Sequence, residues 1–132
     1  MSLRAFIVED HPIIRSNLVA MLEDLANVEV VGCFEGETNA KAWLQLQESD
    51  QEPRWDLGIV DLFLREGSGL GVITACQQRL KHQKVVLMSN FAIKEVRDRC
   101  LQLGADAVFD KSNEIDALLD YCRMVQRAWA NR

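Results

Sequence analysis

Short apolar runs rich in β-branched and aromatic residues recur along the chain and predict strands. Each run is a few residues long and is bounded by polar or turn-forming residues, a pattern typical of buried strands. The runs are Ala5–Val8, Val28–Val31, Leu57–Val60, Val85–Met88 and Ala107–Phe109. Glu29 interrupts the second run, whereas the runs around Ile59 and Val86 are apolar on both faces. We therefore expect the second strand at an edge of the sheet and the other two at its centre.

The segments between these runs place apolar residues three and four positions apart, which predicts a helix after each strand. Gly104 is expected to end the fourth helix, because glycine adopts the left-handed cap conformation easily. A fifth helix is predicted from about Asn113 toward Trp129, with Ser112 or Asn113 as its cap. The apolar positions are Ile14, Leu18, Met21, Leu22 and Leu25; Ala40, Trp43 and Leu44; Leu70, Ile73 and Leu80; Ile93, Val96, Cys100 and Leu103; and Ile115, Leu118, Leu119, Cys122 and Val125.

Regular alternation of strand and helix predicts a doubly wound α/β sandwich, in which right-handed crossovers join parallel strands and helices cover both faces of the sheet. The length of 132 residues, of which 48% are hydrophobic, fits one domain spanning residues 1–132. The polar stretch Glu48–Arg54 is interpreted as a loop within that domain. No apolar stretch approaches the roughly 20 residues of a membrane span, so we expect a cytoplasmic protein without membrane contact.

Charge and cysteine content argue against two further classes of function. The formal net charge of −5 would repel a polyphosphate backbone, so direct nucleic-acid binding by this segment is not expected. The four cysteines lie far apart, with no CxxC pair and no histidine at metal-ligand spacing, which favours reduced and mostly buried thiols. They are Cys33, Cys76, Cys100 and Cys122.

Functional side chains follow four of the predicted strands, at the point where each strand ends. Glu9 and Asp10 follow the first strand, Asp61 the third, Ser89 the fourth and Lys111 the fifth. In an open parallel sheet the carboxyl ends of the strands share one edge, so we expect these side chains to form one site. Three neighbouring carboxylates repel one another, and Mg²⁺ would relieve that repulsion through oxygen ligands. A phosphoryl group arriving on Asp61 would be neutralised by Mg²⁺, Lys111 and Ser89.

Each of these residues also has an ordinary structural interpretation. Because Pro12 is favoured in a first helical turn, Asp10 or His11 could simply cap the helix that follows. An isolated Asp61 after a strand could cap a turn, and a lysine such as Lys111 is usually solvated. Only the coincidence of all four strand ends favours a phosphoryl and metal site over these alternatives.

Four motifs at the predicted strand ends can be compared with known families as a set. They are Ile7-Val8-Glu9-Asp10-His11-Pro12; Val60-Asp61-Leu62-Phe63-Leu64 followed by Gly67-Ser68-Gly69-Leu70; Leu87-Met88-Ser89; and Gly104-Ala105-Asp106 leading to Lys111. This set resembles the receiver domain of two-component response regulators, and the match runs from about Arg4 to Arg127. The resemblance implies a flavodoxin-like fold, with a five-stranded parallel sheet in the strand order 2-1-3-4-5.

The resemblance also implies a role for each acidic residue of the site. Asp61 would be the phosphoacceptor, and Glu9 and Asp10 would form an acidic pocket beside it. Mg²⁺ would be held in that pocket by Asp10, Asp61 and the backbone carbonyl of Phe63.

By the same resemblance, Ser89 would be the switch hydroxyl that moves to meet the phosphoryl oxygen, and Lys111 would form a salt bridge to the phosphoryl group. The donor would be a phosphohistidine on a sensor histidine kinase or a histidine phosphotransfer protein. The domain would catalyse its own phosphorylation and dephosphorylation, without being an enzyme that acts on a separate substrate. A C-terminal effector domain outside this chain, a role in transcription and a homodimer would all fit the family.

Three positions depart from the family pattern. Val108 stands where a tyrosine or phenylalanine is usual, three residues before the lysine, and Arg65 and Ser112 stand where prolines are common. Because neighbouring residues of a strand point to opposite faces, Phe109 cannot replace an aromatic ring at Val108. Two alternatives to a phosphorylated receiver domain stay open.

The first alternative is a receiver-like interaction module that works without phosphorylation, which the missing ring at Val108 favours. The second is a phosphotransferase or phosphatase that uses Asp61 as a covalent nucleophile. Such enzymes usually have a second acid two residues later, where this chain has Phe63.

Overall fold

The computed structural model of the protein describes residues 2–48 and 54–130, in which strands and helices alternate strictly. The interior of the predicted loop at Glu48–Arg54, residues 49–53, lies outside the described residues. The strands are β1 (Leu3–Val8), β2 (Val28–Phe34), β3 (Leu57–Asp61), β4 (Lys84–Ser89) and β5 (Ala107–Asp110). The helices are α1 (Pro12–Leu25), α2 (Glu37–Glu48), α3 (Gly69–Ala75), α4 (Lys94–Gln102) and α5 (Ile115–Ala130).

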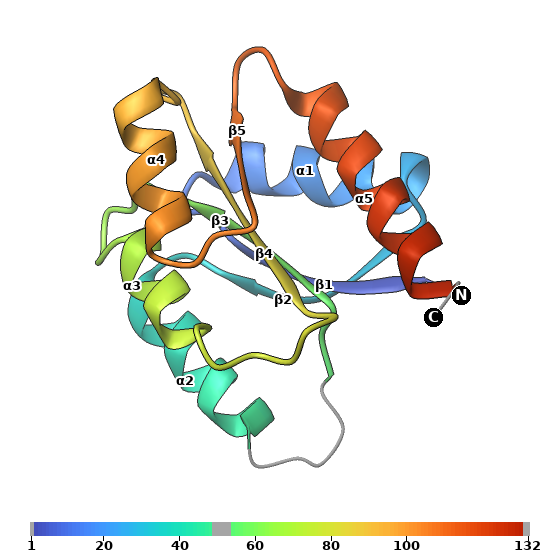
Figure 1. Cartoon of the computed structure of the whole chain (residues 1–132), viewed down its shortest axis with the longest axis horizontal. Helices are drawn as coiled ribbons and strands as arrows, with labels where there is room; N and C mark the ends of the chain where they lie inside the picture. The colour runs from blue at the N-terminus through green and yellow to red at the C-terminus, as the bar shows by residue number, and fades with distance from the viewer. Residues whose placement is uncertain (1, 49–53, 131–132) are drawn as a thin grey trace.

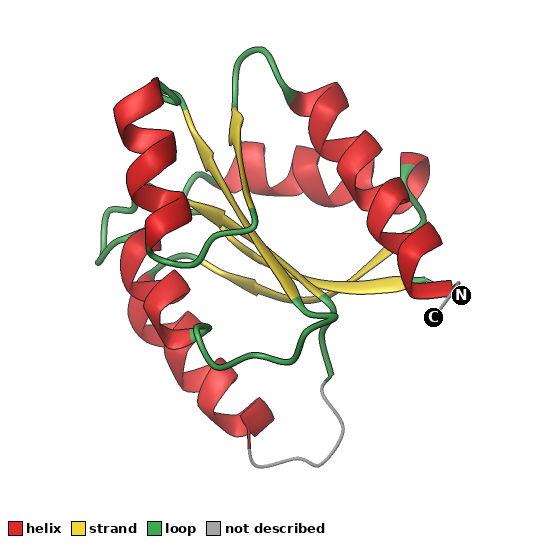
Figure 2. Ribbon diagram, in the orientation of Figure 1, coloured by secondary structure: helices red, strands yellow, loops and turns green. Residues whose placement is uncertain are grey.

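The five strands form one parallel sheet in the order β2-β1-β3-β4-β5, which confirms the predicted strand order (Figure 2). β2, which contains Glu29, lies at an edge, and β3 and β4 are central, also as predicted. The pairing of β1 with β2 shifts by one residue between Ala5 and Phe6. β2 continues to Phe34, three residues beyond the predicted run that ends at Val31. All strands end at the same edge of the sheet because every pairing is parallel.

Helices cover both faces of the sheet, α1 and α5 on one side and α2, α3 and α4 on the other (Figure 1). Alternate side chains of each strand enter the two cores, as the period of two requires. In β1, for example, Ala5 and Ile7 pack with α1 and α5, whereas Phe6 and Val8 pack with the opposite helices. The result is a doubly wound α/β sandwich, as the alternation of elements predicts.

Several helix boundaries differ from the prediction. Leu80 and Ile93 lie outside helices and are exposed, because α3 already ends at Ala75 and α4 begins only at Lys94. Neither Ser112 nor Asn113 caps α5, which begins later, at Ile115. Instead, the carboxylate of Asp110 accepts the N–H groups of Ser112 and Asn113 and shapes the turn before the helix.

Other local predictions are confirmed in whole or in part. Gly104 follows α4 with φ +113°, a conformation that glycine tolerates without strain. Within α1, Leu18 and Leu22 are buried, although Ile14 and Leu25 of the same predicted face are exposed. None of the four cysteines, all of which lie in the described ranges, forms a disulfide, and three of them are buried. In the described ranges no helix is both long and apolar enough to cross a bilayer.

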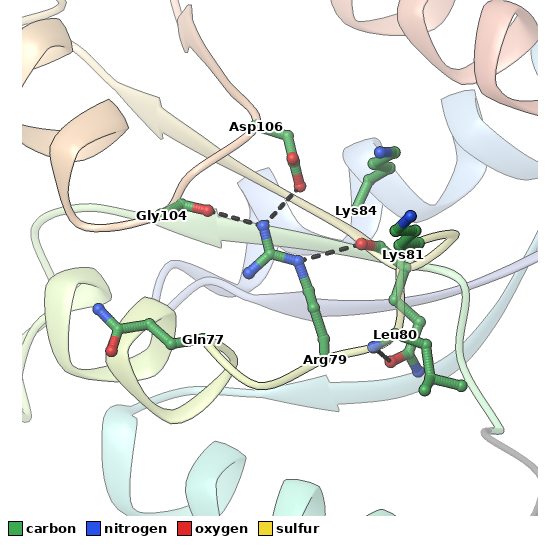
Figure 3. A pocket seen from close by; sticks show the side chains of 8 residues that line it. Gln77, Arg79, Leu80, Lys81, Lys84, Gly104 and Asp106 are labelled. Atoms are coloured by element: carbon green, nitrogen blue, oxygen red, sulfur yellow. Dashed lines mark hydrogen bonds and ion pairs between the residues drawn. The ribbon is translucent and has the colours of Figure 1, made fainter.

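The amino-terminal edge of the sheet is fixed by polar side chains bonded to backbone groups. Buried Asp56 accepts the N–H of Arg4 at 2.9 Å and lies 3.3 Å from Nε2 of His82. Arg79 reaches across a hollow of about 350 Å³ to the Gly104 carbonyl at 2.6 Å and the Asp106 carboxylate at 2.8 Å (Figure 3). These contacts tie the α3–β4 and α4–β5 loops together, at the edge opposite the predicted site.

Gly58 of β3 lies against the ring of Phe6, which packs edge-on against Trp55 at a centroid distance of 4.9 Å. A Cβ at position 58 would come within 2.4 Å of that ring, so Gly58→Ala should lower the free energy of unfolding by about 1–3 kcal/mol through overpacking. Chemical denaturation measures this loss. Combining Gly58→Ala with Phe6→Leu should cost less than the sum of the single variants. Strict additivity would contradict the contact.

Candidate functional site

The carboxylates of Glu9, Asp10 and Asp61 come together at the carboxyl edge of the sheet. One oxygen from each lies within 4.8 Å of the others. Glu9 follows β1 and is buried, Asp10 is half-buried, and Asp61 is the last, buried residue of central strand β3. The parallel pairing of β1 with β3 brings these positions together although about fifty residues separate them.

Lys111 supplies the positive charge of the site. Its ammonium nitrogen lies 2.5 Å from Oε1 of Glu9 and 3.2 Å from Oδ2 of Asp61, and only 12% of its side chain is exposed. The backbone N–H of Lys111 donates to the Ser89 carbonyl at 3.0 Å, so the end of β4 holds the residue in place. The ordinary interpretation of Lys111 as a solvated lysine is therefore wrong.

The electrostatics of the cluster are unbalanced, because three carboxylates face one ammonium. Burial is the largest cause that raises the pKa of Asp61 to about 6; the Lys111 ammonium lowers it and the Glu9 charge raises it again. Burial also acts to lower the pKa of Lys111, but the hydrogen bond to Glu9 and the charges of Asp61 and Glu9 hold it above its ordinary value. Lys111 therefore stays charged, whereas Asp61 takes up a proton at a higher pH than an ordinary aspartate does.

The start of α1 does not use the Asp10 carboxylate as its cap. His11, not Asp10, caps the helix: Nδ1 of His11 accepts the Ile14 N–H at 3.4 Å, with Pro12 in the first turn. Oδ2 of Asp10 instead accepts the backbone N–H of Arg65 at 2.8 Å, from the loop that follows β3. Of the two capping alternatives, the structure selects His11.

Ser89 is fully buried at the end of β4, beside the cluster. Its hydroxyl oxygen accepts the backbone N–H of Phe91 at 2.9 Å, so the side chain is engaged with the following loop. Its backbone carbonyl, and not its hydroxyl, is the group bonded to Lys111. Ser89 is thus close in the fold, but its part in any phosphoryl chemistry stays a prediction.

Asp61 also makes the turn contact that its ordinary interpretation predicts. Its carboxylate accepts the backbone N–H of Phe63, which counts among the smaller influences that lower its pKa. The Phe63 ring is exposed and packs edge-on against Phe91 at a centroid distance of 6.1 Å. A metal bond from the Phe63 carbonyl stays a prediction.

The loop between β3 and α3 is fixed to the start of α2 by two glutamates. The Glu66 carboxylate accepts the backbone N–H of Thr38 at 3.0 Å, and the backbone carbonyl of Glu66 accepts the N–H of Glu37 at 3.1 Å. Glu37 in return accepts the N–H of Ser68 at 2.8 Å. This exchange satisfies helix-terminal N–H groups that would otherwise lack partners, and it fixes the backbone next to Asp61.

Close backbone packing completes the fixation of this loop. The Gly69 N–H donates to the Leu62 carbonyl at 3.0 Å, and a Cβ at Gly69 would come within 2.4 Å of the Asp61 carbonyl oxygen. Ser68 caps α3 through its hydroxyl, which accepts the Leu70 N–H at 3.1 Å. The Gly67-Ser68-Gly69 stretch is therefore a well-packed start of α3.

An apolar hollow of about 260 Å³ adjoins the cluster on the side of α1 and α5. Glu9 and Lys111 form its polar end, and the side chains of α1 form much of its wall. Ile13 of α1, next to Ile14 of that wall, is 66% exposed. The lining is Glu9, Ile14, Asn17, Leu18, Met21, Met88, Asn90, Lys111 and Ile115.

The donors of the cluster fit a hard divalent cation. All three side-chain groups are carboxylate oxygens, the ligand type that Mg²⁺ and Mn²⁺ prefer, and their spacing suits one cation that keeps water ligands. Glu9, Asp10 and Asp61 could therefore hold such an ion.

Sequence reasoning missed Arg65 as the partner of Asp10, and it missed the Glu37–Glu66 exchange. These contacts join residues 28 or more positions apart, and all three use backbone N–H groups, which every residue type except proline has. No spacing rule or residue type marks them in advance. Only the strand ends, which topology forces together, gave a usable signal.

Comparison with known proteins gives a consistent result. The family model of the response regulator receiver domain matches residues 5–123. Response regulator protein VraR of Staphylococcus aureus is 25% identical over 127 residues, which are 96% of this chain and 58% of VraR. The chain therefore spans less than two thirds of the length of the curated relatives it matches.

Two solved structures illustrate the shared fold. A LuxR-family DNA-binding response regulator from Staphylococcus aureus superposes with a TM-score of 0.74 at 19% identity, over 93% of this chain and 98% of that one. The Mn(2+)-bound form of response regulator Rcp1 superposes with a TM-score of 0.71 at 21% identity, over 96% of this chain and 94% of that one.

The raised pKa of Asp61 predicts a pH-dependent stability in metal-free protein. The folded-state value of about 6 lies above the ordinary 3.8, so the folded state binds more protons between these values, and its stability falls as the pH rises through them. Asp61→Asn should remove this loss. Urea unfolding in chelator, between about pH 4 and about pH 8, should show the advantage of Asp61→Asn over wild type growing with pH. A constant difference would show that Asp61 ionises without penalty.

The Glu66 contacts predict a second effect on stability. Glu66→Ala removes the carboxylate that caps α2 and should lower the free energy of unfolding by about 1 kcal/mol. Glu35→Ala is the matched control, because Glu35 is largely exposed and only loosely paired with Arg15, and it should change stability by less than about 0.5 kcal/mol. Equal losses in both variants, measured by chemical denaturation, would rule out the cap.

Proposed function

The chain belongs to the response regulator receiver domain family, and we propose that it is a phosphorylation-controlled switch whose acceptor is Asp61. The observation that carries this proposal is the cluster itself. A buried carboxylate ends the central strand, with an ammonium 3.2 Å away and two more carboxylates whose oxygens lie within 4.8 Å. Such a group can attack a phosphorus atom and then have its new charge balanced by neighbours that are already in place.

In the proposed reaction, an oxygen of the Asp61 carboxylate attacks the phosphorus atom of a phosphohistidine. The bond between phosphorus and the leaving imidazole nitrogen breaks, and its electron pair stays on that nitrogen. Lys111 stabilises the charge that develops on the phosphoryl oxygens, and the surrounding backbone keeps Asp61 aligned. Glu9, Asp10 and Asp61 would hold a Mg²⁺ ion, which supplies further neutralisation of that charge when bound. The Phe63 carbonyl is proposed as a further ligand.

The metal proposal is supported by the donor chemistry and by one neighbour. Rcp1, whose fold this chain shares, has been described in a Mn(2+)-bound form. Mn²⁺ and Mg²⁺ share a preference for oxygen ligands and octahedral geometry, so a site that suits one commonly accepts the other.

For the output, Ser89 is proposed as the switch hydroxyl. It would leave the Phe91 N–H and turn toward the phosphoryl group, so that the loop at residues 90–93 closes inward. The neighbouring surface would change with it. Because VraR is longer than this chain and one structural neighbour is a DNA-binding regulator, we propose that the switch controls transcription through an effector domain or partner. A homodimer of this chain is a further proposed means by which the switch would control transcription.

The proposed phosphodonor is a sensor histidine kinase or a histidine phosphotransfer protein. The apolar hollow beside Glu9 and Lys111, with exposed Ile13 next to it, offers a surface against which a donor helix could pack while its phosphohistidine reaches Asp61. We do not propose an enzyme that acts on a separate substrate; self-catalysed loss of the phosphoryl group is part of the proposed switch.

A second candidate is an interaction module that needs no phosphorylation. The short side chain of Val108, buried where the family usually has an aromatic ring, favours it. Phosphorylation of Asp61 is the property that separates the two candidates.

The test is the intact mass of the protein after incubation with acetyl phosphate and Mg²⁺. Wild type should gain the mass of one phosphoryl group, and Asp61→Asn should gain none, because an amide cannot act as the acceptor. Adding excess chelator to wild type should suppress the gain, because the charge on the phosphoryl group is then left without its metal partner.

Asp98→Asn is the matched control. Asp98 is an exposed carboxylate on α4 that pairs only with Lys94 among its described contacts, so its loss should leave phosphorylation unchanged. Equal labelling of wild type and Asp61→Asn would refute the acceptor assignment. No labelling of wild type, together with unchanged partner binding, would favour the interaction module.

A further inference from the structure

Arg97 of α4 joins three segments of the chain with one guanidinium group. Its Nε donates to the Ala92 carbonyl at 2.6 Å and its Nη1 donates to the Val108 carbonyl at 2.8 Å. Its Nη2 donates to Oε1 of Glu114 in a short ion pair. The side chain is about one-third exposed, so these bonds are partly shielded from water.

The first of these segments is continuous with Ser89. Ala92 belongs to the loop at residues 90–93, and the N–H of Phe91 in that loop is bonded to the Ser89 hydroxyl. If the hydroxyl moves, the Phe91 N–H loses its partner and the Ala92 carbonyl must shift or turn. Arg97 therefore contacts the part of the loop that a movement of Ser89 disturbs first.

The other two segments surround Lys111. Glu114 accepts the Asp110 N–H at 2.8 Å through the same oxygen that binds Arg97, and its own N–H donates to the Asp110 carbonyl at 2.9 Å. These bonds close the turn at residues 110–114, on which Lys111 lies. The hydrogen bond from Arg97, followed by that from Asp110, holds the pKa of Glu114 below its ordinary value, so the pair stays charged.

The side chains of β5 offer no comparable link. Val108 is buried in the core beneath α3 and α4, and Phe109 points to the opposite face, where it packs against Tyr121 at a centroid distance of 5.7 Å. Arg97 instead binds β5 through the backbone carbonyl of Val108. Besides the backbone pairing of β4 with β5, the link between the Ser89 loop and β5 therefore runs through Arg97 of α4 and not through an aromatic ring of β5.

We propose that Arg97 is the positioning residue that couples the loop after Ser89 to β5 and to the turn of Lys111. The proposal rests on the proposed phosphorylation of Asp61. Inward movement of the loop displaces the Ala92 carbonyl, and Arg97 transmits that displacement to the Val108 carbonyl and to Glu114. α4, β5 and the start of α5 then change together, and they form the surface that signals the state of Asp61.

The planar guanidinium is required because it presents donors to three acceptors in fixed directions. A lysine keeps the charge but cannot bind two carbonyls and a carboxylate in this geometry. Arg97→Lys therefore removes the coupling without removing the charge. Glu114→Gln is a milder variant, because it keeps the shape of the side chain and leaves both carbonyl bonds of Arg97 intact.

The experiment compares amide ¹H–¹⁵N spectra with and without Mg²⁺ and beryllofluoride, a mimic of the phosphoryl group, and measures phosphorylation of the same proteins by intact mass. Wild type should show shifts at residues 61–68 and 89–93 and also at residues 107–115. In Arg97→Lys the mass gain and the shifts at residues 61–68 should persist, as should those at 110–112, because Lys111 contacts the phosphoryl mimic directly. The shifts at 107–109 and 113–115 should be lost. Glu114→Gln should lose the shifts at 113–115 but keep those at 107–109.

Arg99→Lys is the matched control, because Arg99 lies exposed on the same helix, and it should behave as wild type. Wild-type shifts at 107–109 and 113–115 in Arg97→Lys would overturn the coupling while leaving the proposed function intact. If wild type neither gains mass nor responds to beryllofluoride, the proposed function fails and the coupling fails with it. Should Arg97→Lys not fold, wild-type shifts at 113–115 in Glu114→Gln would overturn the proposal.

Discussion

The ammonium of Lys111, placed between the carboxylates of Glu9 and Asp61, is the interaction on which the functional edge of the sheet depends. Burying carboxylates costs free energy unless a positive charge lies beside them, and one ammonium cannot balance three. Burial is the main cause that raises the pKa of Asp61 to about 6, so ionising this carboxylate in the folded protein still costs free energy. A divalent cation would offset the remaining negative charge, and together with Lys111 it would face the phosphoryl oxygens of the proposed reaction.

The surrounding contacts hold this cluster in place through backbone groups. Asp10 is bound by the Arg65 N–H, and the loop between β3 and α3 is fixed to α2 by Glu37 and Glu66. Such bonds tolerate little displacement, because each N–H has one favourable direction. The loop after Ser89 is held by a bond of the same kind, from the Phe91 N–H to the Ser89 hydroxyl, and in addition by the Arg97 guanidinium. The loop that follows β3 is thus tied to α2, and the loop that follows β4 is tied through α4 to β5.

The two edges of the sheet show a corresponding difference. At the amino edge, Asp56 and Arg79 bind backbone groups of neighbouring loops, and this edge acts as the fixed base of the fold. At the carboxyl edge, the charged groups face one another and the proposed ligands. The proposed site thus lies beyond the carboxyl ends of the five strands, where ligands generally bind in parallel α/β sheets.

Much of this could be predicted from the sequence, because it depends on local pattern and on topology. The apolar runs determined all five strands, Glu29 placed its strand at an edge, and parallel strand ends brought Glu9, Asp61 and Lys111 together. Helix ends were less predictable from the apolar spacing. Leu80 continues the spacing of α3 although that helix has already ended at Ala75, and Ile93 fits the spacing of α4 although that helix begins only at Lys94.

The tertiary structure alone decided the partners of each functional group. That Asp10 binds the Arg65 N–H, that Glu66 caps α2 and that Arg97 reaches Val108 and Glu114 follow from distances between segments that no residue spacing encodes. Backbone carbonyls, and backbone N–H groups outside proline, are alike in all residues, so the sequence cannot mark which one a side chain will bind. The sequence by itself determined which chemical groups meet at the carboxyl edge, and the folded structure determined how they are held there.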